Sequence, residues 1–401
     1  MIDFELKPET KQLQQMTAAV ANGVFRPVSR YYDDHEHEKV KELYALVESM
    51  TPPVRKETEG EGKKRSGRGL AQGPEPNVAL VVSMEELAWG DTGILLCWPQ
   101  RGLGNSAIEA VGTPEQKARF AGKFAAMAIT EPGAGSDTAA ITSTARLDPE
   151  TNEWIINGEK IFVTSGYHCD AVVVWATLDK SKGRAAIKSF VVEKGVPGMT
   201  VTKVEKKLGI RASDTAAIVF EDCRIPYDNI LGSPEIQNRG EAGLGGVMKT
   251  FDATRPGVAA MAIGVARAAL EFTKTKLESE GHTFPYGRSP LHLNAIQKSI
   301  LEMEAELEVA RLLNLRAASM LDTGIRNSLE ASMAKAKAGR AATLVTQKCV
   351  EILGPIGYSR EHLVEKWLRD CKITDIFEGT GQIQMLIIAR SILGFSRDML
   401  K

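Results

Sequence analysis

The sequence predicts a mainly helical protein with a central β domain, so that the order along the chain is helical, then β, then helical. Three observations carry this prediction. Apolar residues recur at helical spacing toward both ends of the chain. Short segments rich in valine, isoleucine and threonine, separated by glycine, proline and aspartate, fill about residues 125–240. Beyond residue 240 the patterned segments are long enough for a four-helix bundle.

Length and composition limit the classes of protein that this chain can belong to. Its 401 residues suit two or three domains, and we place them at 1–124, 125–240 and 241–401. The 50 basic and 51 acidic residues nearly balance, which argues against a surface for nucleic acid or another polyanion. The five cysteines lie far apart without a Cys-x-x-Cys pair, so we expect free thiols, a reducing compartment and no metal.

The first residues, Met1 to Glu5, do not have the pattern of a secretory signal. Nor does any stretch approach the roughly 18 consecutive apolar residues that a membrane-spanning helix needs. We therefore expect a soluble, cytoplasmic protein.

The N-terminal domain begins with a helical pattern over about residues 13–24, and a second helix is expected at about 40–50. Residues 51–77 are rich in charge, proline and glycine, which predicts a mobile surface loop. A contact between its basic run and a phosphate is the less favoured alternative.

Two more helices are expected at about 78–94 and 103–111. The segment Thr113-Pro114-Glu115-Gln116 then predicts a helix start, with Thr113 as the N-cap and Pro114 at the first helical position. Gln116, three residues after Thr113, completes a capping box.

In the β domain, the segment 154–164 contains the pair Asn157-Gly158 and predicts two strands joined by a tight hairpin turn. Further strands are expected at about 171–176, 189–193, 200–204 and 216–221. In the C-terminal domain, long helical patterns cover about 246–280, 291–322, 328–353 and 382–393.

Glu378 is the leading candidate for a catalytic residue. It stands among apolar residues and glycines in the segment 376–384, directly before an apolar helix. Such surroundings remove water from a carboxylate, raise its pKa and make it a usable general base. Taken alone, the segment is better explained by a solvated glutamate at a helix N-terminus, because the helix dipole favours an acid there. The motifs in the rest of the chain reverse that preference.

A glycine-rich loop at 128–137 is the second candidate site. It is not a dinucleotide fingerprint, because the spacing after Gly135 fails Gly-x-Gly-x-x-Gly and no βαβ unit surrounds it. Its backbone N–H groups and the Ser136 hydroxyl could approach a phosphate or a planar ring closely. An ordinary tight turn is the alternative.

Four motifs occur in order over about 250 residues: 128–137, the strand ending in Val163-Thr164, the segment 251–256 (Phe-Asp-Ala-Thr-Arg-Pro) and the segment 376–384. With these motifs in register, the chain from about residue 78 to 394 resembles an acyl-CoA dehydrogenase. The resemblance implies an N-terminal helical domain, a β domain and a C-terminal four-helix bundle. It also implies FAD as the cofactor, held between the β domain and the bundle, and an acyl-CoA thioester as the substrate.

The resemblance implies a role for each matching residue. Glu378 matches the base that removes the α-proton while the β-hydrogen leaves as hydride to flavin N5. The backbone N–H of Glu378, together with an FAD hydroxyl, would meet the thioester carbonyl. The positions that match FAD contacts are Ile129, Thr130, Ser136, Phe162, Thr164, Thr380 and Gln382. The positions that match substrate contacts are Ser136, Phe251, Asp252, Arg255 and Gly379.

Two positions depart from the family pattern. Gly281 stands where many members have an Arg that reaches the FAD pyrophosphate of a neighbouring subunit. Glu351 replaces a Gln that lines the same FAD, and an acid is unfavourable near a pyrophosphate. Either Arg288 or another cation compensates, or a different partner chain supplies part of the site.

The leading hypothesis is therefore an FAD-dependent acyl-CoA dehydrogenase of fatty acid metabolism that passes electrons to an electron-transfer flavoprotein. An acyl-CoA oxidase is a close rival, because the fold does not separate the two activities. A third hypothesis is that the chain is an FAD-deficient or regulatory subunit of a hetero-oligomer that acts on a bulky, steroid-like thioester. We expect a homo-oligomer, either a dimer or a tetramer. These residues do not indicate which acyl chain length the protein prefers.

Overall fold

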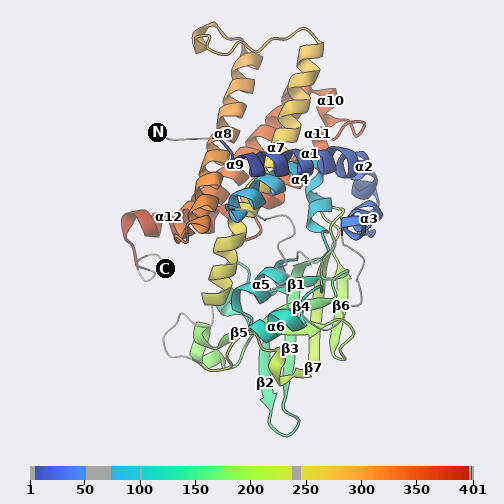
Figure 1. Ribbon diagram of the computed structural model, residues 1–401, viewed down its shortest axis with the longest axis vertical. Helices are drawn as coiled ribbons and strands as arrows, with labels where there is room; N and C mark the ends of the chain where they lie inside the picture. Colours follow the sequence, from blue (N-terminus) through green and yellow to red (C-terminus); the bar gives the residue numbers. More distant parts are fainter. Residues whose placement is uncertain (1–4, 51–73, 100–101, 237–244, 397–398, 400–401) are drawn as a thin grey trace.

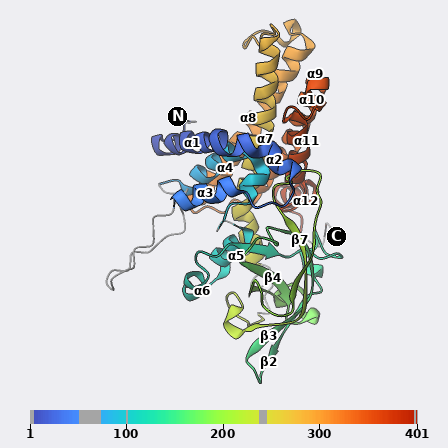
Figure 2. The ribbon, with the colours of Figure 1, turned by 90° about the vertical axis from the view of Figure 1, so that its right-hand side faces the viewer.

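The computed structural model describes residues 5–50, 74–99, 102–236, 245–396 and 399. Long helices lie toward one end of the molecule and a β-sheet lies at the other (Figure 1). The same separation is visible after a turn of 90° (Figure 2). The predicted order of helical, β and helical parts is confirmed. The loop predicted at 51–77 falls mainly on residues 51–73, which lie outside the described residues.

The N-terminal helices lie close to their predicted positions. The Thr113 hydroxyl accepts the backbone N–H of Gln116 at 3.3 Å, and the Gln116 side chain accepts the N–H of Thr113 at 3.0 Å, so the predicted capping box is present. One helix, at residues 26–34, was not predicted. The helices are α1 (Pro8–Val20), α2 (Arg26–Asp34), α3 (Lys41–Met50), α4 (Pro76–Leu96), α5 (Leu103–Val111) and α6 (Pro114–Arg119), with a π-helical turn (Ala21–Phe25) between α1 and α2.

Helix α4 is interrupted at Asp91, whose φ of −166° is not helical. The Asp91 carboxylate accepts the N–H of Ile94 at 2.8 Å and so caps the second half of the helix. Its other oxygen lies 2.7 Å from the ammonium of Lys366 on helix α11 (Val364–Cys371). The interruption therefore ties the N-terminal helices to the C-terminal part of the chain.

The β domain is one sheet of strand order β1-β4-β2-β3-β7-β6, with β5 paired to β4. Neighbouring residues of β1 enter two different hydrophobic clusters, so both faces of this part of the sheet are buried. Helix α5 covers one of these faces through Ala107 and Ile108. The strands are β1 (Ala125–Ala128), β2 (Thr144–Asp148), β3 (Glu153–Thr164), β4 (Ala171–Thr177), β5 (Ile187–Glu193), β6 (Met199–Val204) and β7 (Thr215–Pro226).

The hairpin turn predicted at Asn157-Gly158 is wrong, because both residues lie inside strand β3. The pairing of β3 with β7 shifts register between Ile156 and Gly158, as at a β-bulge. Gly158 has a φ of +146°, and a Cβ there would lie 2.2 Å from the Ser143 Oγ. The glycine is thus required for the close approach of Ser143, which directly precedes β2. The observed hairpin connects β2 to β3 through residues 149–152.

The long C-terminal segments form helices at nearly the predicted residues, and α7, α8 and α9 share one hydrophobic core. A Cβ on Gly264 of α7 would lie 2.2 Å from the Glu85 carbonyl oxygen, so α7 crosses α4 at backbone contact. The two short helices between α9 and α12 were not predicted. The helices are α7 (Gly245–Ser279), α8 (Ala295–Asp322), α9 (Ser328–Leu353), α10 (Pro355–Tyr358), α11 (Val364–Cys371) and α12 (Gly381–Leu393).

The three parts of the chain meet around the segment that precedes α12. A hydrophobic cluster joins Leu95 of α4, Ala212 of the β domain and Val258 of α7, and Phe377 packs against it. The backbone N–H of Ile210 also donates to the Asp370 carboxylate on α11 at 2.6 Å. The residue after Phe377 is Glu378, so the fold positions the candidate base at this junction. Within the described ranges, no helix is long and apolar enough to cross a membrane.

Candidate active site

The backbone around Glu378 is strained. Glu378 has a φ of +57° and Gly379 a φ of +92°, so two successive residues adopt left-handed conformations. A non-glycine residue rarely does so, and such residues are concentrated at functional sites. Thr380 then starts helix α12, and its hydroxyl accepts the N–H of Ile383 at 3.3 Å. The sharp turn thus presents the glutamate just before the helix begins.

The Glu378 carboxylate is held by helix α7. The Thr254 hydroxyl donates a hydrogen bond of 2.8 Å to Glu378 Oε2. Burial raises the pKa of Glu378, and the Thr254 hydrogen bond and the charges of Arg255 and Lys335 offset part of that increase. The net effect is upward, and a raised carboxyl pKa suits a general base that works near neutral pH.

Two buried side chains hold the backbone after Glu378. The Lys335 ammonium on α9 donates to the Gly379 carbonyl oxygen at 2.6 Å. The Gln384 amide on α12 donates to the same oxygen at 3.0 Å and to the Glu378 carbonyl oxygen at 3.4 Å. Within the described residues, the backbone N–H of Glu378 makes no hydrogen bond. That N–H can therefore serve a substrate oxygen.

The sequence reasoning missed Lys335, Gln384 and the role of Thr254. A signal for Lys335 was present, because it interrupts an alanine-rich stretch of α9 whose Ala331, Ala334 and Ala338 are buried. A lysine at such a position needs a partner in the interior.

Asp252 and Arg255 form an ion pair in the first part of α7, with 2.8 Å between Oδ1 and the guanidinium. Asp252 also accepts a hydrogen bond from the Ser328 hydroxyl at the start of α9. Arg255 is only 2% exposed. The contact of these residues with CoA stays a prediction. Phe251 belongs to α7, but its side chain lies outside the part that the structure describes.

The glycine-rich loop after β1 is anchored by a buried ion pair. Glu131 lies 2.7 Å from the Lys160 ammonium of β3, and it also accepts the backbone N–H groups of Thr142 and Ser143. Burial alone would raise the pKa of Glu131, but these hydrogen bonds outweigh it and lower the pKa to about 2. Burial lowers the pKa of Lys160 to about 8. Glu131 therefore anchors the loop as a carboxylate at neutral pH.

The flavin-contact candidates of the β domain lie side by side. The N–H of Ile161 donates to the Thr130 carbonyl oxygen at 2.9 Å, which joins the loop to the end of β3. Next to it, Phe162 has a φ of +56° at a register shift of β3, and its side chain is 61% exposed. Thr164 pairs with Thr215 of β7. An aromatic ring held in solvent by strained backbone fits contact with a planar ring.

The remaining candidates are placed as follows. Ile129 is buried beneath the loop, whereas Ser136 is exposed at its far end. A Cβ on Gly133 or Gly135 would meet nothing within 4 Å, so this part of the loop faces open space. Gln382 is exposed in the first turn of α12. The structure thus groups Glu378, Gly379 and Thr380 with Asp252 and Arg255, and it groups Thr130 with Phe162 and Thr164.

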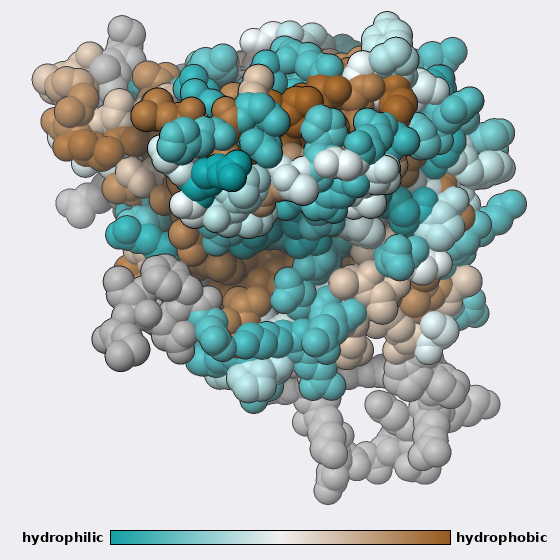
Figure 3. All heavy atoms as spheres, turned by 90° about the horizontal axis from the view of Figure 1, so that it is seen from above, coloured by the Kyte–Doolittle hydropathy of each residue, from teal (hydrophilic) through white to brown (hydrophobic). Residues whose placement is uncertain are grey.

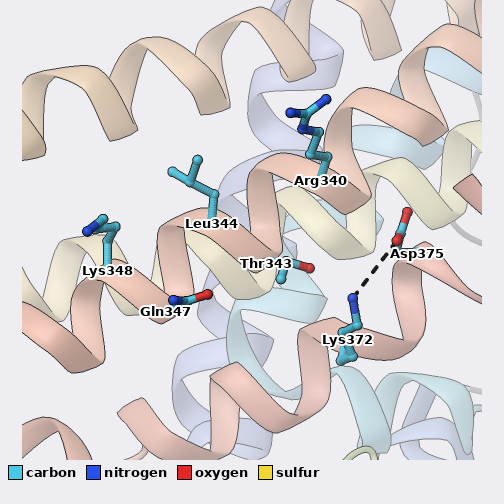
Figure 4. A pocket seen from close by; sticks show the side chains of 7 residues that line it. All are labelled: Arg340, Thr343, Leu344, Gln347, Lys348, Lys372 and Asp375. Carbon is cyan, nitrogen blue, oxygen red and sulfur yellow. Dashed lines mark ion pairs between the residues drawn. The ribbon is translucent and has the colours of Figure 1, made fainter.

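An open pocket of about 360 Å³ lies on the exposed side of α9, next to the 3₁₀ turn Lys372–Asp375 (Figure 4). It is lined by Arg340, Thr343, Leu344, Gln347, Lys348, Lys372 and Asp375. None of the predicted site residues lines it. Nearby, Glu351 is paired with the Lys348 ammonium at 2.6 Å, and this contact lowers the pKa of Glu351.

The three-part fold, with a partly buried glutamate before its last long helix and an exposed aromatic on its sheet, is that of a flavin-dependent oxidoreductase. Three family models cover nearly the whole chain: acyl-CoA dehydrogenase N-terminal domain (residues 7–128), middle domain (126–223) and C-terminal domain (241–393). The chain belongs to the acyl-CoA dehydrogenase family, whose members are FAD-dependent oxidoreductases.

Individual relatives agree with this assignment. The mitochondrial short-chain specific acyl-CoA dehydrogenase of Bos taurus is 39% identical over 400 residues, which is 96% of this chain and 90% of the relative. The structure of butyryl-CoA dehydrogenase from Megasphaera elsdenii matches with a TM-score of 0.82 and 30% identity, over 98% of this chain and all of that one. A chain in the structure of the electron-transferring flavoprotein of Acidaminococcus fermentans matches with a TM-score of 0.77 and 30% identity. The match covers 98% of this chain and all of that one.

Proposed function

We propose that this chain catalyses the α,β-dehydrogenation of a short acyl-CoA thioester, with Glu378 as the base. The observation that carries this proposal is the Glu378 carboxylate itself, which is partly buried, hydrogen-bonded to Thr254 and presented by a strained turn. The short-chain and butyryl-CoA dehydrogenases among its relatives support the substrate class.

In the proposed reaction, ionised Glu378 takes the α-proton of the thioester. Thr254 orients the carboxylate for this transfer, since its hydroxyl donates to Oε2 of Glu378. The backbone N–H of Glu378 stabilises the negative charge that develops on the thioester carbonyl. When bound, FAD supplies the acceptor for the hydride that leaves the β-carbon.

The residues proposed to hold the FAD ring are Ile129, Thr130, Phe162 and Thr164, whereas Ser136, Thr380 and Gln382 are proposed to contact the rest of the cofactor. The fit is supported by the exposed ring of Phe162 and the open side of the loop at Gly133. The residues proposed to contact the acyl-CoA are Ser136, Phe251, Asp252, Arg255 and Gly379.

The proposal includes an electron acceptor and an oligomeric state. Electron transfer to an electron-transfer flavoprotein is supported by the match to a chain in the Acidaminococcus fermentans flavoprotein structure. A homo-oligomer is supported by the apolar side of α12, where Met385, Leu386, Ile392 and Leu393 are exposed. Hydrophobic side chains gather at the left of Figure 3, the side on which Figure 1 shows α12.

We also propose that the protein is cytoplasmic and that its domains span residues 1–124, 125–240 and 241–401.

The ion pair of Glu351 and Lys348 bears on the alternative of an incomplete FAD site. The acid that replaces the usual amide is already compensated within this chain, so its charge is a smaller obstacle to a nearby pyrophosphate. This weakens one of the two arguments for an FAD-deficient subunit, and the argument from Gly281 is unchanged.

The test is the visible spectrum of the purified protein before and after anaerobic addition of butyryl-CoA, with octanoyl-CoA and a steroid-like thioester for comparison. The proposal is supported if butyryl-CoA bleaches the flavin band and the protein releases an α,β-unsaturated thioester. Bound flavin that no thioester bleaches would overturn it. Rapid bleaching by the bulky thioester alone would overturn the substrate class.

A further inference from the structure

Lys335 occupies a position where a lysine is costly. It lies on the inward face of α9 between the buried residues Ala331 and Ala338, and its own exposed fraction is 0%. Moving an ammonium out of water is unfavourable unless the interior offers acceptors or opposite charges. The contacts that stabilise this ammonium therefore indicate what it does.

Its hydrogen-bond acceptor is the backbone directly after the base. Lys335 Nζ lies 2.6 Å from the Gly379 carbonyl oxygen, and the Gln384 amide reaches the same oxygen at 3.0 Å. The two donors come from different helices, α9 and α12. Because Glu378 and Gly379 both have positive φ values, this stretch would relax without such external bonds.

We propose that Lys335 is a positioning residue for Glu378, which holds the strained turn through the Gly379 carbonyl and, while protonated, places a positive charge near the base. The proposal rests on the proposed function, in which Glu378 takes the substrate proton. Lys335 touches neither substrate nor cofactor in this role.

Charged groups from several elements face this ammonium. They are Asp375 of the 3₁₀ turn, Glu378 itself and Arg255 of α7. Burial lowers the pKa of Lys335 to about 8, although Asp375 and Glu378 raise it. Below this pKa the ammonium is charged, and its charge lowers the pKa of Glu378, as Arg255 and the Thr254 hydrogen bond also do. Removing the charge must then raise the pKa of Glu378 further.

The main variant is Lys335→Gln, which removes the charge and keeps a hydrogen-bond donor. Gln384→Leu removes the neutral donor to the same carbonyl, and Ser332→Ala is a matched change at a buried polar residue one turn earlier on α9. Two quantities are measured in the FAD-loaded protein. One is the pH at which the infrared band of the protonated Glu378 carboxyl disappears, assigned by its absence in Glu378→Gln. The other is the rate of flavin reduction by butyryl-CoA between pH 5 and 9.

We expect Lys335→Gln to move the infrared midpoint and the acidic limb of the rate profile upward by about one pH unit. Lys335→Arg keeps the charge and should leave both near their wild-type positions. Gln384→Leu should lower the rate without moving either midpoint, because only the rigidity of the turn is reduced. Ser332→Ala should change neither quantity.

Unmoved midpoints in a folded Lys335→Gln variant would overturn the proposal, as would an equal shift in Lys335→Arg. If Lys335→Gln does not fold, Lys335→Met carries the same expectation, because it is also neutral and fills the apolar surroundings. If no thioester reduces the flavin, the proposed function fails, and the infrared titration still decides whether Lys335 controls Glu378.

Discussion

The Thr254 hydroxyl on α7 donates a hydrogen bond of 2.8 Å to Glu378 Oε2, across a separation of 124 residues along the chain. Thr254 precedes Pro256, which lies inside the same helix, and Glu378 lies in the turn before α12. The contact joins two motifs that are distant in sequence, and it bears directly on the charge of the candidate base.

Replacing Thr254 by Val should therefore raise the pKa of Glu378, since a hydrogen bond that favours the carboxylate is lost. A raised pKa leaves more of the base protonated, so the acidic limb of the rate profile should move to higher pH. The loss of orientation should also lower the rate of flavin reduction by about tenfold. Thr254→Ser, which keeps the hydroxyl, is the control. Stopped-flow measurements between pH 5 and 9 check both expectations.

Glu378→Gln should bind FAD but lose the base. We expect the rate of flavin reduction by butyryl-CoA to fall by about three orders of magnitude, within the range attributed to a positioned general base. The flavin absorbance per protein chain should remain that of the wild type. Turnover at more than a tenth of the wild-type rate would show that another group takes the proton.

Phe162→Ala should weaken FAD binding without unfolding the protein. Its side chain is 61% exposed, so little buried area is lost in the protein without flavin, and the melting temperature of that form should be unchanged within about 2 °C. Loss of an aromatic contact should raise the dissociation constant of FAD by about tenfold. Phe162→Trp is the control that keeps the contact. Recovery of free flavin fluorescence on dilution measures the difference.

Lys160→Met should destabilise the β domain, because it leaves the Glu131 carboxylate buried without its counter-ion. We expect a loss of roughly 3 kcal/mol in the free energy of unfolding, measured by urea denaturation.

The double variant Glu131→Gln/Lys160→Met should recover part of that loss, because no uncompensated charge remains. Equal stability of the single and double variants would contradict this account of the ion pair.

Much of the fold follows from local patterns. Helix α9 begins and ends at the predicted residues, Ser328 and Leu353, and the capping box of Thr113 and Gln116 is present as expected. These features depend on residues within one or two turns, so one sequence is enough to find them. The hairpin predicted at Asn157-Gly158 is wrong because the glycine is required by the close approach of Ser143, the residue that precedes strand β2.

The candidate site divides in the same way. The amino-acid sequence alone places Glu378 between apolar residues and glycine before a helix, and it shows which motifs accompany this residue. The chemistry open to Glu378 depends on the folded chain, because burial raises its pKa and the Thr254 hydroxyl and the Lys335 charge come from other helices. Desolvation and electrostatic interaction act through space, and a residue's chemical neighbours are not its neighbours along the chain.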